Sequence, residues 1–152
     1  MANESTGERS NIAAPLKALV VDDQVLNRML LRMIIEDSGF VVVEAESGEA
    51  AARKAARTAF AFIVMDQNMP GLSGDETVRR IRAKGASAKA FVARWTTGRP
   101  DPKDAPLYDA ELPKPIIDAV LTAAAAAARR RAAEAPSARR RSRSKELATS
   151  AR

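Results

Sequence analysis

The chain has 152 residues, of which 46% are hydrophobic and 29% are charged, a balance that suits one globular domain with a hydrophobic core. It contains no cysteine and no histidine, which excludes a disulfide framework, a thiolate metal site and the commonest general base. No stretch is long and apolar enough to span a bilayer, and the first residues lack the pattern of a signal peptide, so we expect a cytoplasmic protein.

The net charge of +6 is unevenly distributed along the chain. Residues 16–121 contain 15 basic and 15 acidic side chains, whereas residues 122–152 contain nine basic and two acidic ones. The basic tail could bind the phosphates of a nucleic acid non-specifically, or an acidic protein surface. No aromatic residue follows Tyr108 to stack on bases, so we expect a disordered, solubilising extension rather than a nucleic-acid-binding segment.

Apolar patterning predicts strands that alternate with helices, after a disordered leader over residues 1–15. Strands are expected within 16–23, 40–45, 60–66, 89–98 and 110–115. Helices are expected over 27–38, 48–58, 73–85 and 115–131, with Ser47 and Ser73 as N-caps and Pro115 at the start of the last helix. We expect the methionines of the first helix to fill the core.

Strands that alternate with helices indicate a parallel sheet with helices on both faces. In such sheets the functional crevice lies beyond the carboxyl ends of the strands. That rule gathers the residues that end predicted strands, namely Asp22, Asp23, Asp66, Thr96, Thr97 and Lys114. Taken alone, each of them is explained equally well as a turn, cap or surface residue. Only their occurrence together at the ends of the strands indicates a functional site.

Three carboxylates at one edge repel one another, and a hard divalent cation removes that penalty. Mg²⁺ prefers oxygen ligands and keeps several waters, so Asp23 and Asp66 would bind directly and Asp22 directly or through water. The open coordination positions suit a phosphoryl oxygen. Asp66 could then be the nucleophile, while Lys114 and a threonine hydroxyl would neutralise the other phosphoryl oxygens.

The segments LVVDDQVLNRMLL, IVMDQNMPGLSGDE and LPKP, with a threonine at the end of the fourth strand, resemble the receiver domain of two-component response regulators over residues 16–122. The first two are especially similar to receivers attached to hybrid histidine kinases. The resemblance implies a flavodoxin-like α/β fold with five parallel strands in the order 2-1-3-4-5. It also implies Asp66 as phosphoacceptor, Lys114 paired with the phosphoryl group, and Mg²⁺ held by Asp22, Asp23, Asp66 and the backbone carbonyl of Asn68.

Two features differ from the family pattern. The family usually has an aromatic residue three positions before the lysine, where this chain has Glu111; Trp95, beside the threonines, could in principle replace it. Only twelve residues, three of them proline, separate Gly98 from Glu111, so we expect the fourth helix to be shortened or irregular. Thr97, followed by Gly98, resembles the switch threonine of a variant group of stand-alone receivers, and Thr96 is the competing assignment.

We therefore expect a stand-alone receiver that accepts a phosphoryl group on Asp66 from a histidine kinase or a histidine phosphotransfer protein. It would catalyse its own phosphorylation and slow dephosphorylation without being a true enzyme, as a monomer or weak dimer. One alternative is a pseudo-receiver that binds proteins without being phosphorylated. Another is a phosphohydrolase of the haloacid-dehalogenase type, which would need a second Asp where this chain has Asn68. Residues 123–152 are expected to extend the last helix and then form the basic tail.

Overall fold

Strands and helices alternate along the chain in the computed structural model, which describes residues 14–99 and 101–135. The strands are β1 (Lys17–Val21), β2 (Val41–Ala45), β3 (Phe62–Asp66), β4 (Phe91–Thr96) and β5 (Ala110–Pro113). The helices are α1 (Val25–Asp37), α2 (Gly48–Arg57), α3 (Gly74–Ala83) and α4 (Asp118–Glu134), and one 3₁₀ turn, η1 (Ala105–Leu107), precedes β5.

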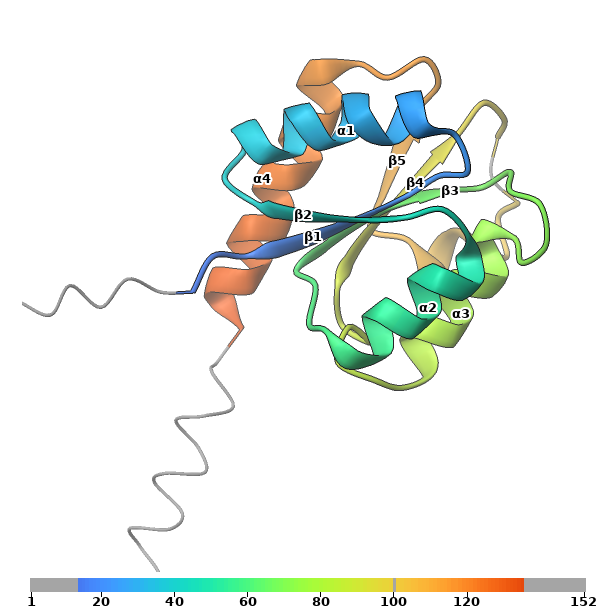
Figure 1. The fold of residues 1–152 in the computed structure, drawn as a ribbon, viewed down its shortest axis with the longest axis horizontal. Helices are drawn as coiled ribbons and strands as arrows, with labels where there is room; N and C mark the ends of the chain where they lie inside the picture. The colour runs from blue at the N-terminus through green and yellow to red at the C-terminus, as the bar shows by residue number, and fades with distance from the viewer. Residues whose placement is uncertain (1–13, 100, 136–152) are drawn as a thin grey trace, which may run out of the picture.

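The five strands form one parallel sheet in the order β2-β1-β3-β4-β5 (Figure 1). The central strand β3 is buried at all five of its residues, as a parallel strand covered on both faces should be. The predicted flavodoxin-like fold is confirmed. The link between β4 and β5 contains the single turn η1 in place of a regular helix, which confirms the expected irregularity.

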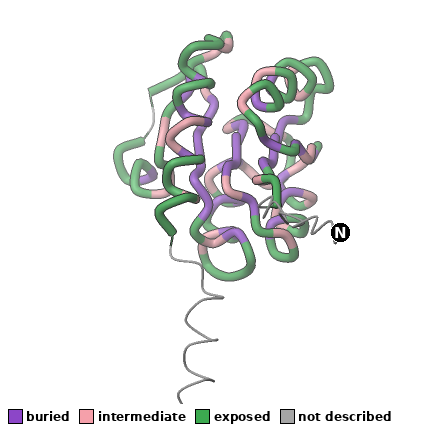
Figure 2. The backbone as a smooth tube through the Cα atoms, turned by 90° about the vertical axis from the view of Figure 1, so that its left-hand side faces the viewer, coloured by how far each residue is buried: buried purple, intermediate pink, exposed green. Residues whose placement is uncertain are grey.

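Helices cover both faces of the sheet. Helices α1 and α4 lie on one face, and α2 and α3 lie on the other (Figure 1). Each face has its own core of buried apolar side chains, and Figure 2 shows the buried residues running through the interior behind exposed outer helix surfaces. The first core includes Phe62, Trp95 and Leu121, and the second includes Ile63, Met65 and Ile81.

The ends of the helices follow local signals in the sequence. The Ser47 hydroxyl accepts a hydrogen bond from the Ala50 N–H, and the Ser73 hydroxyl accepts one from the Glu76 N–H, so both predicted N-caps are confirmed. The predicted start of the last helix at Pro115 is wrong. Ile117 still has an extended backbone, and the helix begins only at Asp118.

The expectation that the methionines of α1 fill the core is also wrong. Met29 and Met33 are more than half exposed, and only Leu31 and Ile35 of this helix are buried. The apolar residues of α1 run more than halfway round the helix, while the sheet covers one stripe of it. The apolar residues that the sheet does not cover form an exposed apolar face of α1, made up of Val25, Leu26, Met29, Leu30 and Met33.

Helix α4 packs on the sheet well past the expected domain boundary at residue 122. Ala124, Ala125 and Ala128 are buried, so this part of the helix belongs to the core. Arg129 donates to the Ser38 carbonyl oxygen at the end of α1, and Arg131 lies over the Phe91 ring. The predicted leader over residues 1–13 and the predicted basic tail over residues 136–152 lie outside the described residues.

Candidate functional site

Three carboxylates meet at the edge of the sheet where the strands have their carboxyl ends. Asp22 and Asp23 follow β1 directly, and Asp66 is the last residue of the neighbouring strand β3. One carboxylate oxygen from each residue lies within 4.8 Å of those of the other two. Asp22 and Asp66 are buried and Asp23 is exposed, so the cluster reaches solvent through Asp23. The topology thus brings together the three acids that the sequence placed at one edge.

Asp22 has the most perturbed environment of the three acids. Burial raises its pKa to about 6; the hydrogen bond from the Gln24 N–H opposes this shift, and the negative charge of Asp66 adds to it. The two Asp22 oxygens are held by the Gln24 N–H at 2.7 Å and by the Asn27 side-chain amide at 3.2 Å. A buried carboxylate beside another acid is costly in free energy, and a cation bound at the cluster would offset that cost. The all-oxygen set of donors could therefore hold a metal ion.

Lys114 brings a positive charge to Asp66 from the far side of β4. It follows β5 directly, and its ammonium lies 2.6 Å from Asp66 Oδ1. Asp66 Oδ1 also accepts a hydrogen bond from the Asn68 N–H at 3.3 Å. Both donors act on Oδ1, and the second oxygen, Oδ2, receives neither of them. Asn68 itself is exposed in the loop after β3, where its carbonyl is the predicted fourth metal ligand.

The two candidate threonines differ in their positions. Thr96 is the last residue of β4, is half-buried, and accepts a hydrogen bond from the Gly98 N–H at 3.3 Å. Thr97 is exposed in the bend that follows the strand. The strand register pairs Asp66 with Trp95, so Thr96 lies one residue beyond the neighbour of Asp66.

Sequence reasoning considered Trp95 only as a substitute for the usual aromatic residue and missed its contact with Lys114. The Lys114 ammonium lies 4.5 Å from the centroid of the Trp95 ring. The Trp95 side chain is buried, and its indole N–H donates to the Pro113 carbonyl oxygen at 3.1 Å. The only signal in the sequence was the position of a large aromatic beside the threonines.

A buried cluster of charges around Arg94 was also missed. Arg94 is 2% exposed in the middle of β4 and forms an ion pair with Glu111, its register neighbour on β5. Its guanidinium lies 4.6 Å from the centroid of the Tyr108 ring and 3.7 Å from Asp75 on α3. The Tyr108 hydroxyl donates to Asp75 and also lies 3.4 Å from the side-chain oxygen of Gln67, the residue after Asp66. A charged residue inside the apolar run FVARWT was the available signal.

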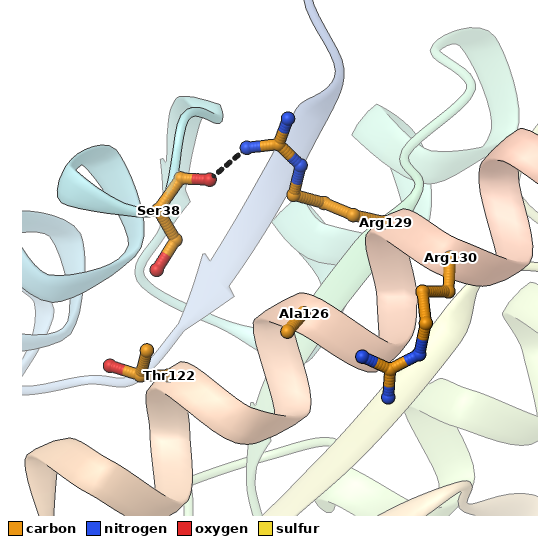
Figure 3. Close-up of a pocket in the computed structure, with 5 residues that line it drawn as sticks. All are labelled: Ser38, Thr122, Ala126, Arg129 and Arg130. Atoms are coloured by element: carbon orange, nitrogen blue, oxygen red, sulfur yellow. Dashed lines mark hydrogen bonds between the residues drawn. The ribbon is translucent and has the colours of Figure 1, made fainter.

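A separate hollow lies between the end of α1 and the middle of α4 (Figure 3). It is lined by Ser38, Thr122, Ala126, Arg129 and Arg130. In the close-up, Arg129 turns toward the Ser38 carbonyl oxygen, whereas Arg130 points away from it. Because Ser38 lies shortly before β2, this hollow is at the opposite end of the sheet from Asp66. It contributes nothing to the acidic site.

The fold and the site together define a CheY-like receiver module: a five-stranded parallel sheet whose carboxyl edge carries three acids and a lysine. The family model for the response regulator receiver domain matches residues 18–126. The chain belongs to this family, which functions in two-component signalling. No helix in the described part of the chain is long and apolar enough to cross a membrane.

Relatives of known role show the same family. The chain is 49% identical over 72 residues to the virulence sensor protein BvgS of Bordetella pertussis, a match that covers 47% of this chain and 6% of BvgS. It is 38% identical over 78 residues to the chemotaxis protein CheY of Listeria monocytogenes, covering 51% and 66% of the two chains. A response regulator of Oryza sativa, ORR41, is 35% identical over 94 residues, covering 59% and 73%. The chain thus spans only a small part of BvgS.

Solved structures agree on the fold. Chemotaxis protein CheY4 of Vibrio cholerae matches with a TM-score of 0.64 and 28% identity, covering 71% of this chain and 93% of that one. A CheY-like receiver domain from Methylobacillus flagellatus matches with a TM-score of 0.71 and 22% identity, covering 76% and 99%. The receiver domain of a sensor histidine kinase from Pseudomonas aeruginosa, solved with a magnesium ion in its active-site cleft, matches with a TM-score of 0.66 and 24% identity, covering 74% and 95%.

Proposed function

We propose that Asp66 accepts a phosphoryl group from a phosphohistidine donor, with Mg²⁺ held by Asp22, Asp23, Asp66 and the backbone carbonyl of Asn68. One observation carries this proposal. A buried carboxylate at the end of β3 has an ammonium 2.6 Å from one oxygen and two further carboxylates within 4.8 Å. This set of charges suits the transfer of a phosphoryl group better than it suits a structural ion pair.

The residues of this chain would act as follows. An Asp66 oxygen attacks phosphorus in line, the new O–P bond forms as the N–P bond to the donor imidazole breaks, and the imidazole keeps the electron pair of that bond and is protonated by solvent. Lys114 transfers its hydrogen bond from Asp66 to a phosphoryl oxygen, which neutralises part of the charge there. One of the two threonines, Thr97 or Thr96, donates its hydroxyl to another phosphoryl oxygen. Bound Mg²⁺ would supply a Lewis acid that draws charge from the phosphoryl oxygens.

The donor would be a histidine kinase or a histidine phosphotransfer protein, and the exposed apolar face of α1 supports a protein partner. Helix α1 begins two residues after Asp23, so its first turn borders the acidic cluster. Leu26 is 73% exposed there, and Met29, one turn further on, is 52% exposed. A contiguous apolar patch beside a reactive group is typical of a surface that docks another protein. Catalysis would be limited to the receiver's own phosphorylation and slow hydrolysis, in the cytoplasm, with the receiver as a monomer or weak dimer.

Labelling by acetyl phosphate tests this function without a cognate donor. The wild-type chain should become phosphorylated in the presence of Mg²⁺ and remain unlabelled with EDTA, as measured by intact-protein mass spectrometry. Asp66→Asn should abolish labelling, while Asp37→Asn, which alters an exposed acid at the end of α1, should label like wild type. Equal labelling of wild type and Asp66→Asn would reject Asp66 as the acceptor.

The pseudo-receiver alternative makes the opposite prediction. A binding module with a vestigial site would show no Mg²⁺-dependent change in Trp95 fluorescence when beryllofluoride is added. A receiver that is competent for phosphorylation should show a change, because Lys114 would move toward the phosphoryl mimic and Trp95 lies under its ammonium. Replacing each threonine by valine in turn would identify the switch residue, since only the correct one should weaken that response.

A further inference from the structure

We infer that Trp95 is a positioning residue, whose indole face holds the Lys114 ammonium at the reaction site throughout the phosphoryl transfer. This inference rests on the proposed function of Asp66 and adds a residue to its machinery. It starts from the strand register, which pairs Trp95 with Asp66 on one side and with Leu112 on the other. Trp95 therefore lies between the acceptor strand and the strand that delivers the lysine.

The indole is held at two points. Trp95 is 4% exposed and belongs to the core on the α1 and α4 side of the sheet. Its N–H donates to the carbonyl oxygen of Pro113, the residue immediately before Lys114. The ring is thus fixed relative to the backbone from which the lysine side chain extends. A buried ring fixed in this way is a rigid platform.

The Lys114 side chain lies over this platform. Its ammonium is 4.5 Å from the ring centroid and 2.6 Å from Asp66 Oδ1, and its side chain is only 20% exposed. A cation within about 6 Å of a tryptophan ring centroid is attracted to the face of the ring, more strongly where water is excluded. A free lysine side chain occupies many rotamers. Its contacts with Trp95 and Asp66 act as two anchors that restrict these rotamers in advance, so less entropy is lost when the ammonium binds a phosphoryl oxygen.

The two anchors differ in what happens to them during the reaction. The Asp66 carboxylate loses its negative charge when the phosphoryl group is attached, so its ion pair with Lys114 is necessarily rearranged. The Trp95 ring takes no part in the bonds that form and break. It is therefore the anchor that persists, and it confines the Lys114 ammonium to a short movement from the carboxylate to a phosphoryl oxygen.

Nuclear magnetic resonance tests the contact in the free protein. Protons over an aromatic face are shifted upfield by the ring current, so the methylene next to the Lys114 ammonium should give an upfield signal that is absent in Lys114→Met. Trp95→Leu should move that signal to the position of an exposed lysine, and Trp95→Phe should keep part of the shift. An unshifted signal in the wild type would overturn the inference.

Kinetics test the consequence. Trp95→Leu should lower the maximal rate of labelling by acetyl phosphate about five- to tenfold, within the range expected of a largely desolvated cation–π contact. Its Mg²⁺ affinity, measured by calorimetry, should stay within about twofold of wild type, because the hydrogen bonds that hold the Asp22 and Asp66 carboxylates come from Gln24, Asn27, Asn68 and Lys114 and not from the indole. Trp95→Phe, which keeps an aromatic face, should recover most of the rate.

Phe91→Leu is the matched control, because it removes a ring from the other end of β4 in the same core cluster. It should label at about the wild-type rate once the folded fraction is accounted for. Equal rate losses in Trp95→Leu and Phe91→Leu, a parallel loss of Mg²⁺ affinity, or a wild-type rate in Trp95→Leu would each overturn the inference while leaving Asp66 as acceptor. A wild-type chain that is not labelled would overturn the proposed function, and the inference with it.

Discussion

Arg94 and Glu111 form a two-point ion pair between β4 and β5: Arg94 Nη2 lies 2.8 Å from Glu111 Oε1, and Arg94 Nε lies 3.1 Å from Oε2. Glu111 occupies the position where the family usually has an aromatic residue. In this chain the position holds a carboxylate fixed by a buried guanidinium, so it has no ring to move in step with the switch threonine. The Tyr108 ring lies over the same guanidinium, with its centroid 4.6 Å away.

The first prediction concerns this ion pair. Glu111→Ala should lower the free energy of unfolding by about 1–3 kcal/mol, because it leaves a buried guanidinium short of a partner. Urea denaturation provides the measurement. Glu36→Ala is a closely matched control: the Glu36 side chain is 44% exposed against 43% for Glu111, but its partner Arg32 is itself 44% exposed. The control should change by no more than about 0.5 kcal/mol. Equal losses of unfolding free energy in Glu111→Ala and Glu36→Ala would show that burial of Arg94 does not strengthen its ion pair.

The second prediction concerns pH. Because the pKa of Asp22 is raised to about 6 in the folded chain from an ordinary value of 3.8, the folded chain keeps a proton that the unfolded chain has released. In EDTA this contribution favours folding below about pH 4 and is lost as the pH rises through about 6. Asp22→Asn should therefore match wild type near pH 4 and be more stable by about 1–3 kcal/mol above pH 6, since one pKa unit corresponds to about 1.4 kcal/mol.

Denaturation of both chains across this pH range checks that prediction. Asp118→Asn serves as the control, because Asp118 is an exposed acid in the first turn of α4. The difference in free energy of unfolding between Asp118→Asn and wild type should not rise between pH 4 and pH 6. A stability difference between Asp22→Asn and wild type that stays constant with pH would contradict the assigned environment of Asp22.

The third prediction concerns the exposed apolar face of α1. The double variant Leu26→Ala, Met29→Ala should keep the wild-type stability within about 0.5 kcal/mol, because both side chains are more than half exposed. Transfer from a phosphorylated histidine phosphotransfer domain should slow about tenfold, whereas labelling by acetyl phosphate should not change. Val41→Ala removes an apolar side chain of 45% exposure from β2 and should affect neither reaction. Unchanged transfer in the double variant would exclude this face as the docking surface.

The fourth prediction separates two adjacent arginines of α4, Arg130 and Arg131. Arg131 pairs with Asp109 at 2.8 Å and lies 4.8 Å from the centroid of the Phe91 ring, so Arg131→Ala should cost about 0.5–1.5 kcal/mol of stability. Arg130→Ala should be nearly neutral, because no ion pair or hydrogen bond of Arg130 occurs within the part of the chain that the structure describes. Thermal unfolding of the two variants checks this order, and a larger loss for Arg130→Ala would reverse it.

The sequence by itself determined the order of elements, both serine caps and the edge at which the acids gather. These features depend on local patterns and on one topological rule, because the carboxyl ends of parallel strands always meet at the same edge. Asp22 and Asp66 could be placed together for that reason, although 44 positions separate them in the chain. The short link before β5 also followed from its length and its prolines.

Only the tertiary structure decided which apolar and charged side chains are buried. The helical spacing of apolar residues in α1 could not show that Met29 and Met33 face outward. How much of the helix surface is covered depends on the sheet against which it packs. Arg94 is buried because its partners arrive from β5, α3 and the turn before β5, and no local pattern encodes that meeting. Lys114 likewise reaches both Asp66 and Trp95 only because β4 lies between β3 and β5.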